Sequence, residues 1–181
     1  MDILLSHVKF FVLPIFFGAV YVGYPLSERK KDKSAHKIST PEKTIKFIED
    51  FFIPKSTYDY YTIKIIHYMY RNGLVHLYQP KSVKLRGNKK ITWFIYRGKS
   101  FMKEIEINTD IGVIKFTNVN HLKLMGHPIN KRLIYLPISI DCLYLDFENA
   151  LKAYRDKLQK TKYLQRNWRT AVNAIIKPQW M

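Results

Sequence analysis

The chain has 181 residues, of which 31 are Lys or Arg and 14 are Asp or Glu, so its formal net charge is +17. This balance favours an acidic partner: nucleic acid, anionic lipid or an acidic protein surface. The single cysteine, Cys142, excludes an internal disulfide and fits a reducing compartment. Lysine outnumbers arginine, however, and AT-rich coding produces the same bias without any selection for binding.

The first strong feature is an apolar segment near the N-terminus. Phe10 to Leu26 contains 17 residues without a charge, and with Ile3–Lys9 a helix there is long enough to cross the ~30 Å hydrocarbon core of a bilayer. We therefore predict a single transmembrane helix over residues 1–26 and a basic juxtamembrane linker over residues 27–40. The basic flank puts the rest of the chain on the cytoplasmic or matrix side. A cleaved signal sequence and a buried core helix are the alternatives.

Residues 41–145 are enough for one compact domain, for which we predict an α+β fold. A Thr-Pro-Glu sequence marks the start of a first helix, which Pro54 ends. Ser56 with Asp59 resembles the capping box of a second helix, which Asn72-Gly73 would stop. Because the connection is short, we expect the two helices to form an αα-hairpin that packs on a small antiparallel β-sheet.

The sheet itself is predicted from a change in the apolar period. Beyond Gly73 this period changes from 3.6 to 2, which is typical of strands. Three segments between Ile91 and Val119, separated by turns, predict an antiparallel meander. A further apolar stretch, Leu133–Leu145, is interrupted by Pro137 and predicts an edge strand on either side of it.

Residues 146–181 predict a long amphipathic C-terminal helix capped by Asp146. Apolar residues recur there at spacings of three and four, and polar Thr161 and Gln165 interrupt the row. A helix of this length exceeds what a domain of this size covers. We therefore expect a break or a partner contact at the polar interruption.

The common metal, redox, nucleotide and hydrolase motifs are absent from the sequence. We therefore predict no catalytic residue, no metal, no cofactor and no enzymatic activity. His121 and His127 are the best candidates for metal ligands, but no third ligand is indicated, and ordinary surface or capping histidines are the favoured alternative. Cys142 beside Asp141 is a candidate nucleophile for which nothing specifies a base.

Basic and aromatic residues are interleaved from Lys84 to Phe101, a combination that holds single-stranded nucleic acids on sheet faces. The favoured interpretation is nevertheless that these aromatic residues form the core face of a strand. The predicted contacts to a partner or an anionic surface are Arg86, Lys89, Lys90, Arg97 and Lys99 in this segment, and Arg166, Trp168 and Arg169 in the C-terminal helix.

Together these features favour a non-catalytic, single-pass accessory or assembly subunit of a larger membrane protein complex, such as a respiratory-chain complex. The expected partners are other subunits of that complex and anionic lipid headgroups. The mitochondrial inner membrane is the favoured compartment, and a bacterial plasma membrane is the alternative. The alternative function is a membrane-tethered basic module that binds nucleic acid or ribosomes.

Overall fold

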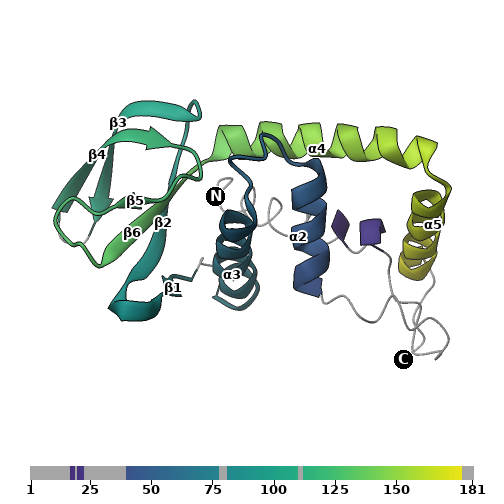
Figure 1. The fold of residues 1–181 in the computed structure, drawn as a ribbon, viewed down its shortest axis with the longest axis horizontal. Helices are drawn as coiled ribbons and strands as arrows, with labels where there is room; N and C mark the ends of the chain where they lie inside the picture. Colours follow the sequence, from purple (N-terminus) through teal and green to yellow (C-terminus); the bar gives the residue numbers. More distant parts are fainter. Residues whose placement is uncertain (1–16, 19, 23–39, 78–80, 110–111, 177–181) are drawn as a thin grey trace. The chain divides into compact units, whose positions relative to one another are not determined.

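The computed structural model describes residues 17, 18, 20–22, 40–77, 81–109 and 112–176 (Figure 1). The chain forms two compact units. One, which we call the helical unit, comprises Met1–Phe52 and Glu148–Met181, and the other, the sheet unit, comprises Ile53–Phe147. The described residues have an α+β fold with a mixed sheet.

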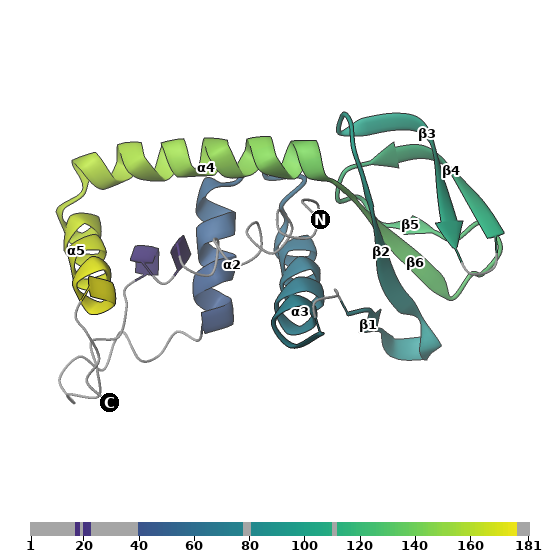
Figure 2. The ribbon, with the colours of Figure 1, turned by 180° about the vertical axis from the view of Figure 1, so that it is seen from behind.

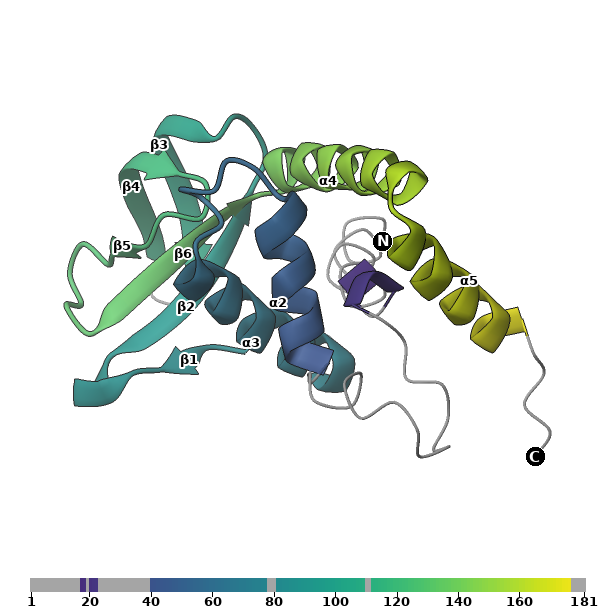
Figure 3. The same ribbon diagram turned by 45° about the vertical axis from the view of Figure 1, so that its right-hand side comes forward.

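The sheet unit contains α3 (Tyr60–Leu77) and two small sheets. The first sheet has the order β1 (Val83–Lys84), β2 (Lys90–Tyr96), β6 (Leu133–Ser139) and β5 (Met125–Gly126), with the short 3-10 helix η2 (Arg86–Asn88) between β1 and β2. The second pairs β3 (Phe101–Thr109) with β4 (Gly112–Asn120). Figures 1 and 3 show β3 and β4 on one side of the first sheet and α3 on the other.

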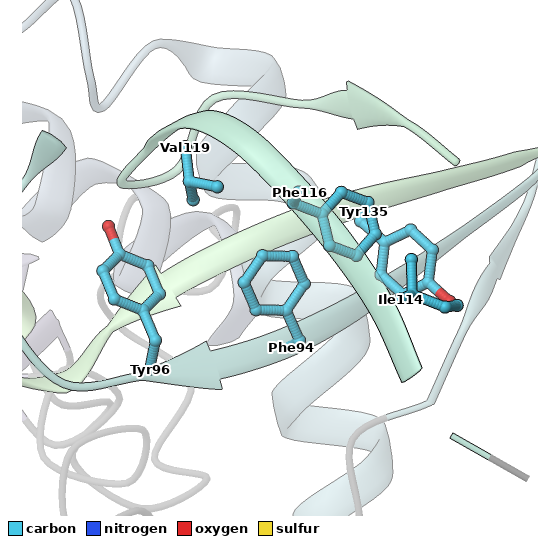
Figure 4. Packing of buried hydrophobic residues seen from close by; sticks show 6 residues of the cluster. All are labelled: Phe94, Tyr96, Ile114, Phe116, Val119 and Tyr135. Atoms are coloured by element: carbon cyan, nitrogen blue, oxygen red, sulfur yellow. The ribbon is translucent and has the colours of Figure 1, made fainter. Parts of the chain in front are cut away.

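An aromatic core fills the space between the two sheets (Figure 4). The rings of Phe94 on β2 and Phe116 on β4 stack with their centroids 5.1 Å apart, and Tyr135 on β6 packs against both. Phe94 and Tyr96 are 6% and 7% exposed, so the prediction that aromatic residues of this strand form a core face is confirmed.

The predicted antiparallel meander is correct for β3 and β4, which pair antiparallel, and wrong for β2. Its three strands exist, but β2 pairs in parallel with β6, in the register Phe94↔Pro137, instead of pairing with β3. The aromatic face of β2 lies against β4, so the chain after β2 starts a second sheet stacked on the first. When two sheets stack, the aromatic side chains on their facing surfaces are buried against each other. Aromatic side chains on neighbouring strands of one sheet only lie next to each other on the same surface.

The predicted interruption at Pro137 is also wrong, because β6 runs through this residue. Its neighbour β5 pairs only with Ile134 and Tyr135, so Pro137 lies beyond the end of that ladder. The carbonyl of Pro137 accepts a hydrogen bond from Leu122 N–H at 2.8 Å. A strand tolerates proline where no ladder partner needs its missing N–H.

Two features of the predicted αα-hairpin need correction. The first helix belongs to the helical unit and the second, α3, to the sheet unit. Asp59 is the N-cap of α3, since its Oδ1 accepts from Tyr61 N–H and Thr62 N–H, and the helix passes Gly73 to end at Leu77. An interior glycine costs only about 1 kcal/mol relative to alanine, so Gly73 is a weak stop.

The helical unit contains α2 (Thr40–Phe51), α5 (Lys162–Ile176), the C-terminal part of α4 (Ile140–Lys160) and the helical residues among 17–22. Residues 17, 18 and 20–22 lie between α2 and α5 (Figures 1 and 2). The ring of Tyr21 meets those of Phe51 and Tyr154 at 5.0 and 6.0 Å, and Asn167 Nδ2 donates to its carbonyl oxygen.

These contacts show that the prediction of an N-terminal transmembrane helix is wrong. Val20 and Tyr21 are 1% and 5% exposed, and the Phe17 ring stacks on Phe47, so this part of the apolar segment packs inside protein. Within the described ranges, no helix is long and apolar enough to cross a bilayer. Residues 1–16, 19 and 23–26 of the predicted anchor, and 27–39 of the predicted linker, lie outside the described residues. An apolar segment suits a protein interior as well as lipid, and its composition alone does not distinguish them.

The predicted long C-terminal helix is two helices. α4 begins six residues before Asp146, at Ile140, because Ser139 Oγ caps it by accepting from Cys142 N–H at 3.2 Å. α4 ends at Lys160 and α5 begins at Lys162, so of the break or partner contact expected at the polar residues Thr161 and Gln165, a break is found at Thr161. Gln165 Nε2 donates to the carbonyls of Leu158 and Gln159, which satisfies the end of α4.

Candidate functional site

A pocket of about 850 Å³ opens in the sheet unit where α3 and α4 begin and β4 ends. Leu122, Leu124 and Leu145 supply apolar walls, and its ionisable lining residues are Asp59, His121, Lys123, Cys142 and Asp146. Its volume falls in the range of ligand-binding pockets. Three candidate residues of the sequence analysis, His121, Cys142 and Asp146, therefore share one cavity.

His121 is held by its main chain and by its ring. Its N–H donates to Ser100 O at 2.7 Å, and its Nδ1 accepts from Ser139 N–H at 2.9 Å. Burial lowers the pKa of His121 to about 4, so the ring is neutral near pH 7. Since Nδ1 is an acceptor, the proton of the neutral ring is on Nε2, which has no hydrogen-bond partner among the described residues.

This protonation state leaves His121 without a free lone pair for a metal. His127 is used in the same way, because its Nδ1 accepts from the backbone N–H groups of Ile129 and Asn130 at 3.0 and 2.9 Å. Both histidines therefore fix loops, which is the alternative that the sequence favoured. In the part of the chain that the structure describes, no group of three His, Cys, Asp or Glu side chains is placed to hold a metal ion.

Cys142 lies in the pocket wall but is not joined to a base there. Its Sγ points to the carbonyl oxygen of Gly98 at 3.7 Å, and Ser139 Oγ donates to the same oxygen at 2.6 Å. The described hydrogen bonds of His121 use its main chain and Nδ1, and none reaches Cys142. A nucleophilic cysteine needs a neighbouring base or cation to form its thiolate, so this arrangement favours a structural thiol.

Asp146, predicted as a helix cap, faces the pocket instead. Tyr58 OH donates to its Oδ2 at 2.7 Å. Burial raises the pKa of the Asp146 carboxyl, and the hydrogen bond from Tyr58 acts in the opposite direction. Burial also raises the pKa of Tyr58 well above its ordinary value, with the Asp146 charge adding to the shift. The pair binds the start of α4 to the segment before α3, which is a structural role.

The predicted contacts on β2 lie at two ends of the strand. Arg86, Lys89 and Lys90 are at its start, and Arg97 and Lys99 follow its end; all are exposed. A seven-residue strand spans roughly 20 Å, so these residues form two separate groups. Of the three aromatic residues between them, Phe94 and Tyr96 are in the core and cannot join either group, whereas Trp93 is half-buried.

The three predicted contacts in the C-terminal helix lie on two different faces of α5. Arg166 and Arg169 lie with Lys162 on one exposed face of α5, at spacings of four and three residues. Trp168 is turned inward, with its ring 6.4 Å from that of Tyr154. α5 contains no acidic residue, and no ion pair to the three cations is found within the described residues. We call Lys162, Arg166 and Arg169 the cationic row.

Sequence reasoning missed the pocket, because its walls come from segments that are distant along the chain. Tyr58 and Asp146 are 88 residues apart, and no local pattern relates them. It also missed an exposed face on α3 formed by Tyr60, Tyr61, Lys64 and Tyr68. Helical periodicity was sufficient to find that face, since the buried residues Ile63, Ile66 and Met69 lie on the opposite side.

Comparison with models of known protein families, with curated proteins and with solved structures finds no match. The function of the chain has therefore to be argued from its own surfaces and cavities.

Proposed function

We propose that this chain is a non-catalytic protein that binds nucleic acid by contact, with the cationic row of α5 as its main contact surface. The observation that carries the proposal is the segregation of charge on this helix. Lys162, Arg166 and Arg169 are exposed on one face, while Leu164 and Ala171 are buried on the other. Exposed Lys152 and Lys160 add positive charge on α4.

The spacing of these cations suits a phosphate backbone. From Lys162 to Arg169 the helix rises roughly 10 Å, and each strand of a duplex carries a phosphate every 3.4 Å or so along its axis. A row of this length runs past about three phosphate intervals of one strand, so each of its three cations has a phosphate within reach, and arginine binds phosphate through two parallel hydrogen bonds. AT-rich coding explains an excess of lysines, but it does not explain two arginines on the face of a helix that contains no acidic residue.

A membrane-complex subunit remains the other prediction from the sequence. That function depended on an N-terminal transmembrane helix, and none is found among the described residues. Its compartments, the mitochondrial inner membrane or a bacterial plasma membrane, and its partners stay predictions. A catalytic function has less support, because the His121 and Cys142 side chains make separate hydrogen bonds within the described structure.

Salt-dependent binding tests the proposal. Fluorescence anisotropy with a labelled RNA at about 50 and 200 mM salt should show a steep loss of affinity, because phosphate contacts release counterions. Replacing both arginines, Arg166→Gln with Arg169→Gln, should weaken binding about tenfold at the lower salt. It should also reduce the slope of log affinity against log salt by about 1.4, since two phosphate contacts are lost.

The matched control removes the same net charge elsewhere. Lys103→Gln with Lys115→Gln acts on exposed residues of β3 and β4, and should change the affinity less than about twofold. Equal losses in the two double variants would mean that total charge, and not the cationic row, determines binding. Absence of RNA and DNA binding by the wild-type chain at low salt would refute the proposed function.

A further inference from the structure

The solvent face of α3 carries three tyrosines and a lysine within a narrow arc. At about 100° per residue, Tyr60, Lys64, Tyr68 and Tyr61 fall within roughly 100° of one another around the helix. Tyr61 is 77% exposed, Tyr68 52% and Tyr60 48%. We call these four residues the tyrosine face.

The rings of the tyrosine face are held by their neighbours. Lys64 Nζ lies 4.6 Å from the centroid of the Tyr60 ring, which in turn meets the Tyr61 ring at 5.9 Å and 73°. The Tyr68 ring packs at 6.1 Å and 76° against the buried His67. Rings that are already oriented lose little conformational entropy on binding a ligand.

The tyrosine face carries a cation of its own. Lys64 belongs to the face, and its Nζ lies over the Tyr60 ring. The nearest acid in sequence is Asp59, whose carboxylate already accepts the N–H groups of Tyr61 and Thr62. Aromatic rings beside cations form the surfaces on which unpaired bases stack.

We propose that Tyr61 and Tyr68 stack unpaired bases of a single-stranded nucleic acid, with Lys64 facing its phosphates. The inference rests on the proposed function and narrows the ligand from nucleic acids in general to single strands. A duplex keeps its bases stacked inside, whereas a single strand presents them to aromatic side chains. The helix rises roughly 10 Å from Tyr61 to Tyr68, so each ring takes a base of its own.

The test compares two probes with equal numbers of phosphates, a labelled oligouridylate and a blunt RNA duplex. For Tyr61→Ala with Tyr68→Ala, we expect single-strand affinity to fall about tenfold or more and duplex affinity to change less than about twofold. The salt slope should be unchanged, because stacking releases no counterion. Alanine is the best helix former, so α3 should persist, which circular dichroism checks.

The conservative pair, Tyr61→Phe with Tyr68→Phe, keeps both rings and should bind the oligouridylate like the wild type. A loss in this pair as large as in the alanine pair would assign the contact to the hydroxyl groups and overturn stacking. Unchanged single-strand affinity in the alanine pair, or equal losses on both probes, would overturn it too and leave binding by the cationic row intact. A wild-type chain that binds neither probe would overturn both proposals together.

Discussion

The two units build their aromatic cores from differently spaced parts of the chain. In the sheet unit, Phe94, Phe116 and Tyr135 come from strands that follow one another at short intervals. In the helical unit, Phe47 of α2 packs against Phe17, far upstream, and against Tyr154, far downstream on α4. One core is thus assembled largely from one stretch of sequence, and the other from three distant stretches.

This difference determines how well each core can be predicted from the sequence. A strand that alternates apolar and polar residues indicates its own buried side. A segment that is apolar all round, such as the one containing Phe17 and Tyr21, indicates only that it avoids water. Whether lipid or protein covers it depends on α2 and α4, which its own sequence does not describe.

Phe47→Ala has the largest expected effect, and it tests the core assembled from distant stretches. Phe47 is fully buried, and its ring lies 5.7 Å from those of Phe17 and Tyr154. Removing the ring loses apolar burial and leaves a cavity, so we expect the free energy of unfolding to fall by about 3–5 kcal/mol. Urea unfolding measures the loss, and hydrogen exchange should place it in α2 and in the part of α4 around Tyr154.

Alanine variants of two further phenylalanines, one buried and one exposed, give the values with which this loss is compared. Phe116→Ala should cost a similar amount, with the faster exchange in β2 and β4, because Phe116 is 1% exposed in the other core. Phe101 is 51% exposed, so Phe101→Ala should cost less than about 1 kcal/mol. If Phe47→Ala proves as mild as Phe101→Ala, the helical core is not packed as described.

The pH dependence of the free energy of unfolding tests the sheet unit, because His121 lies in that unit. The unfolded ring binds a proton below its ordinary pKa of 6.5, but the folded ring does so only below about 4. Between these values the unfolded state binds more protons, so stability falls as the pH falls. From pH 7 to about pH 4.5, the loss due to His121 should be about 2 kcal/mol.

His121→Asn is the matched variant for this titration. An asparagine Oδ1 can accept from Ser139 N–H as Nδ1 does, and it does not titrate. The wild type should therefore lose more stability on acidification than the variant, although the raised pKa of Asp146 acts in the opposite direction in both. Parallel pH profiles would show that His121 is not buried in its neutral form.

Gly18→Ala tests the correction to the predicted transmembrane helix. A Cβ on Gly18 would lie 2.7 Å from the carbonyl carbon and oxygen of Lys43, so α2 has to move to accept it. We expect a loss of about 1–3 kcal/mol in urea unfolding. Gly126→Ala is the control, since a Cβ there meets nothing within 4 Å. A glycine surrounded by lipid would tolerate alanine as well as Gly126 does.

The fold was predictable where neighbours in sequence determine it. The strands β2 to β4, the start of α2 and the break at Thr161 follow from local patterns, and so does the core face of Phe94 and Tyr96. The parallel pairing of β2 with β6 was not predictable, since it depends on which face packs against β4. Ser139 displaced Asp146 as the cap of α4 because β6 already brings the chain to that position.

The candidate sites differ in the same way, because some are formed by neighbours in sequence and one is formed by distant segments. The cationic row and the tyrosine face each lie on one helix, so helical periodicity is enough to find them. The pocket required the approach of α3, β4 and α4, and its lining residue Asp146 accepts a hydrogen bond from Tyr58, 88 residues away. Sequence patterns are therefore sufficient to locate surfaces of this kind but not the pocket, although of the two surfaces only Arg166 and Arg169 were predicted.

Asp59→Ala has the smallest expected effect, and it tests a purely local feature. The Asp59 carboxylate accepts from Tyr61 N–H at 2.8 Å and from Thr62 N–H at 3.0 Å, and these bonds lower its pKa, led by the one from Thr62. Loss of this cap should cost about 1 kcal/mol in urea unfolding. Asp59→Asn keeps an acceptor without the charge and should restore most of the loss. If asparagine is as destabilising as alanine, charge at the start of α3 matters more than the hydrogen bonds, and even this local feature depends on its surroundings.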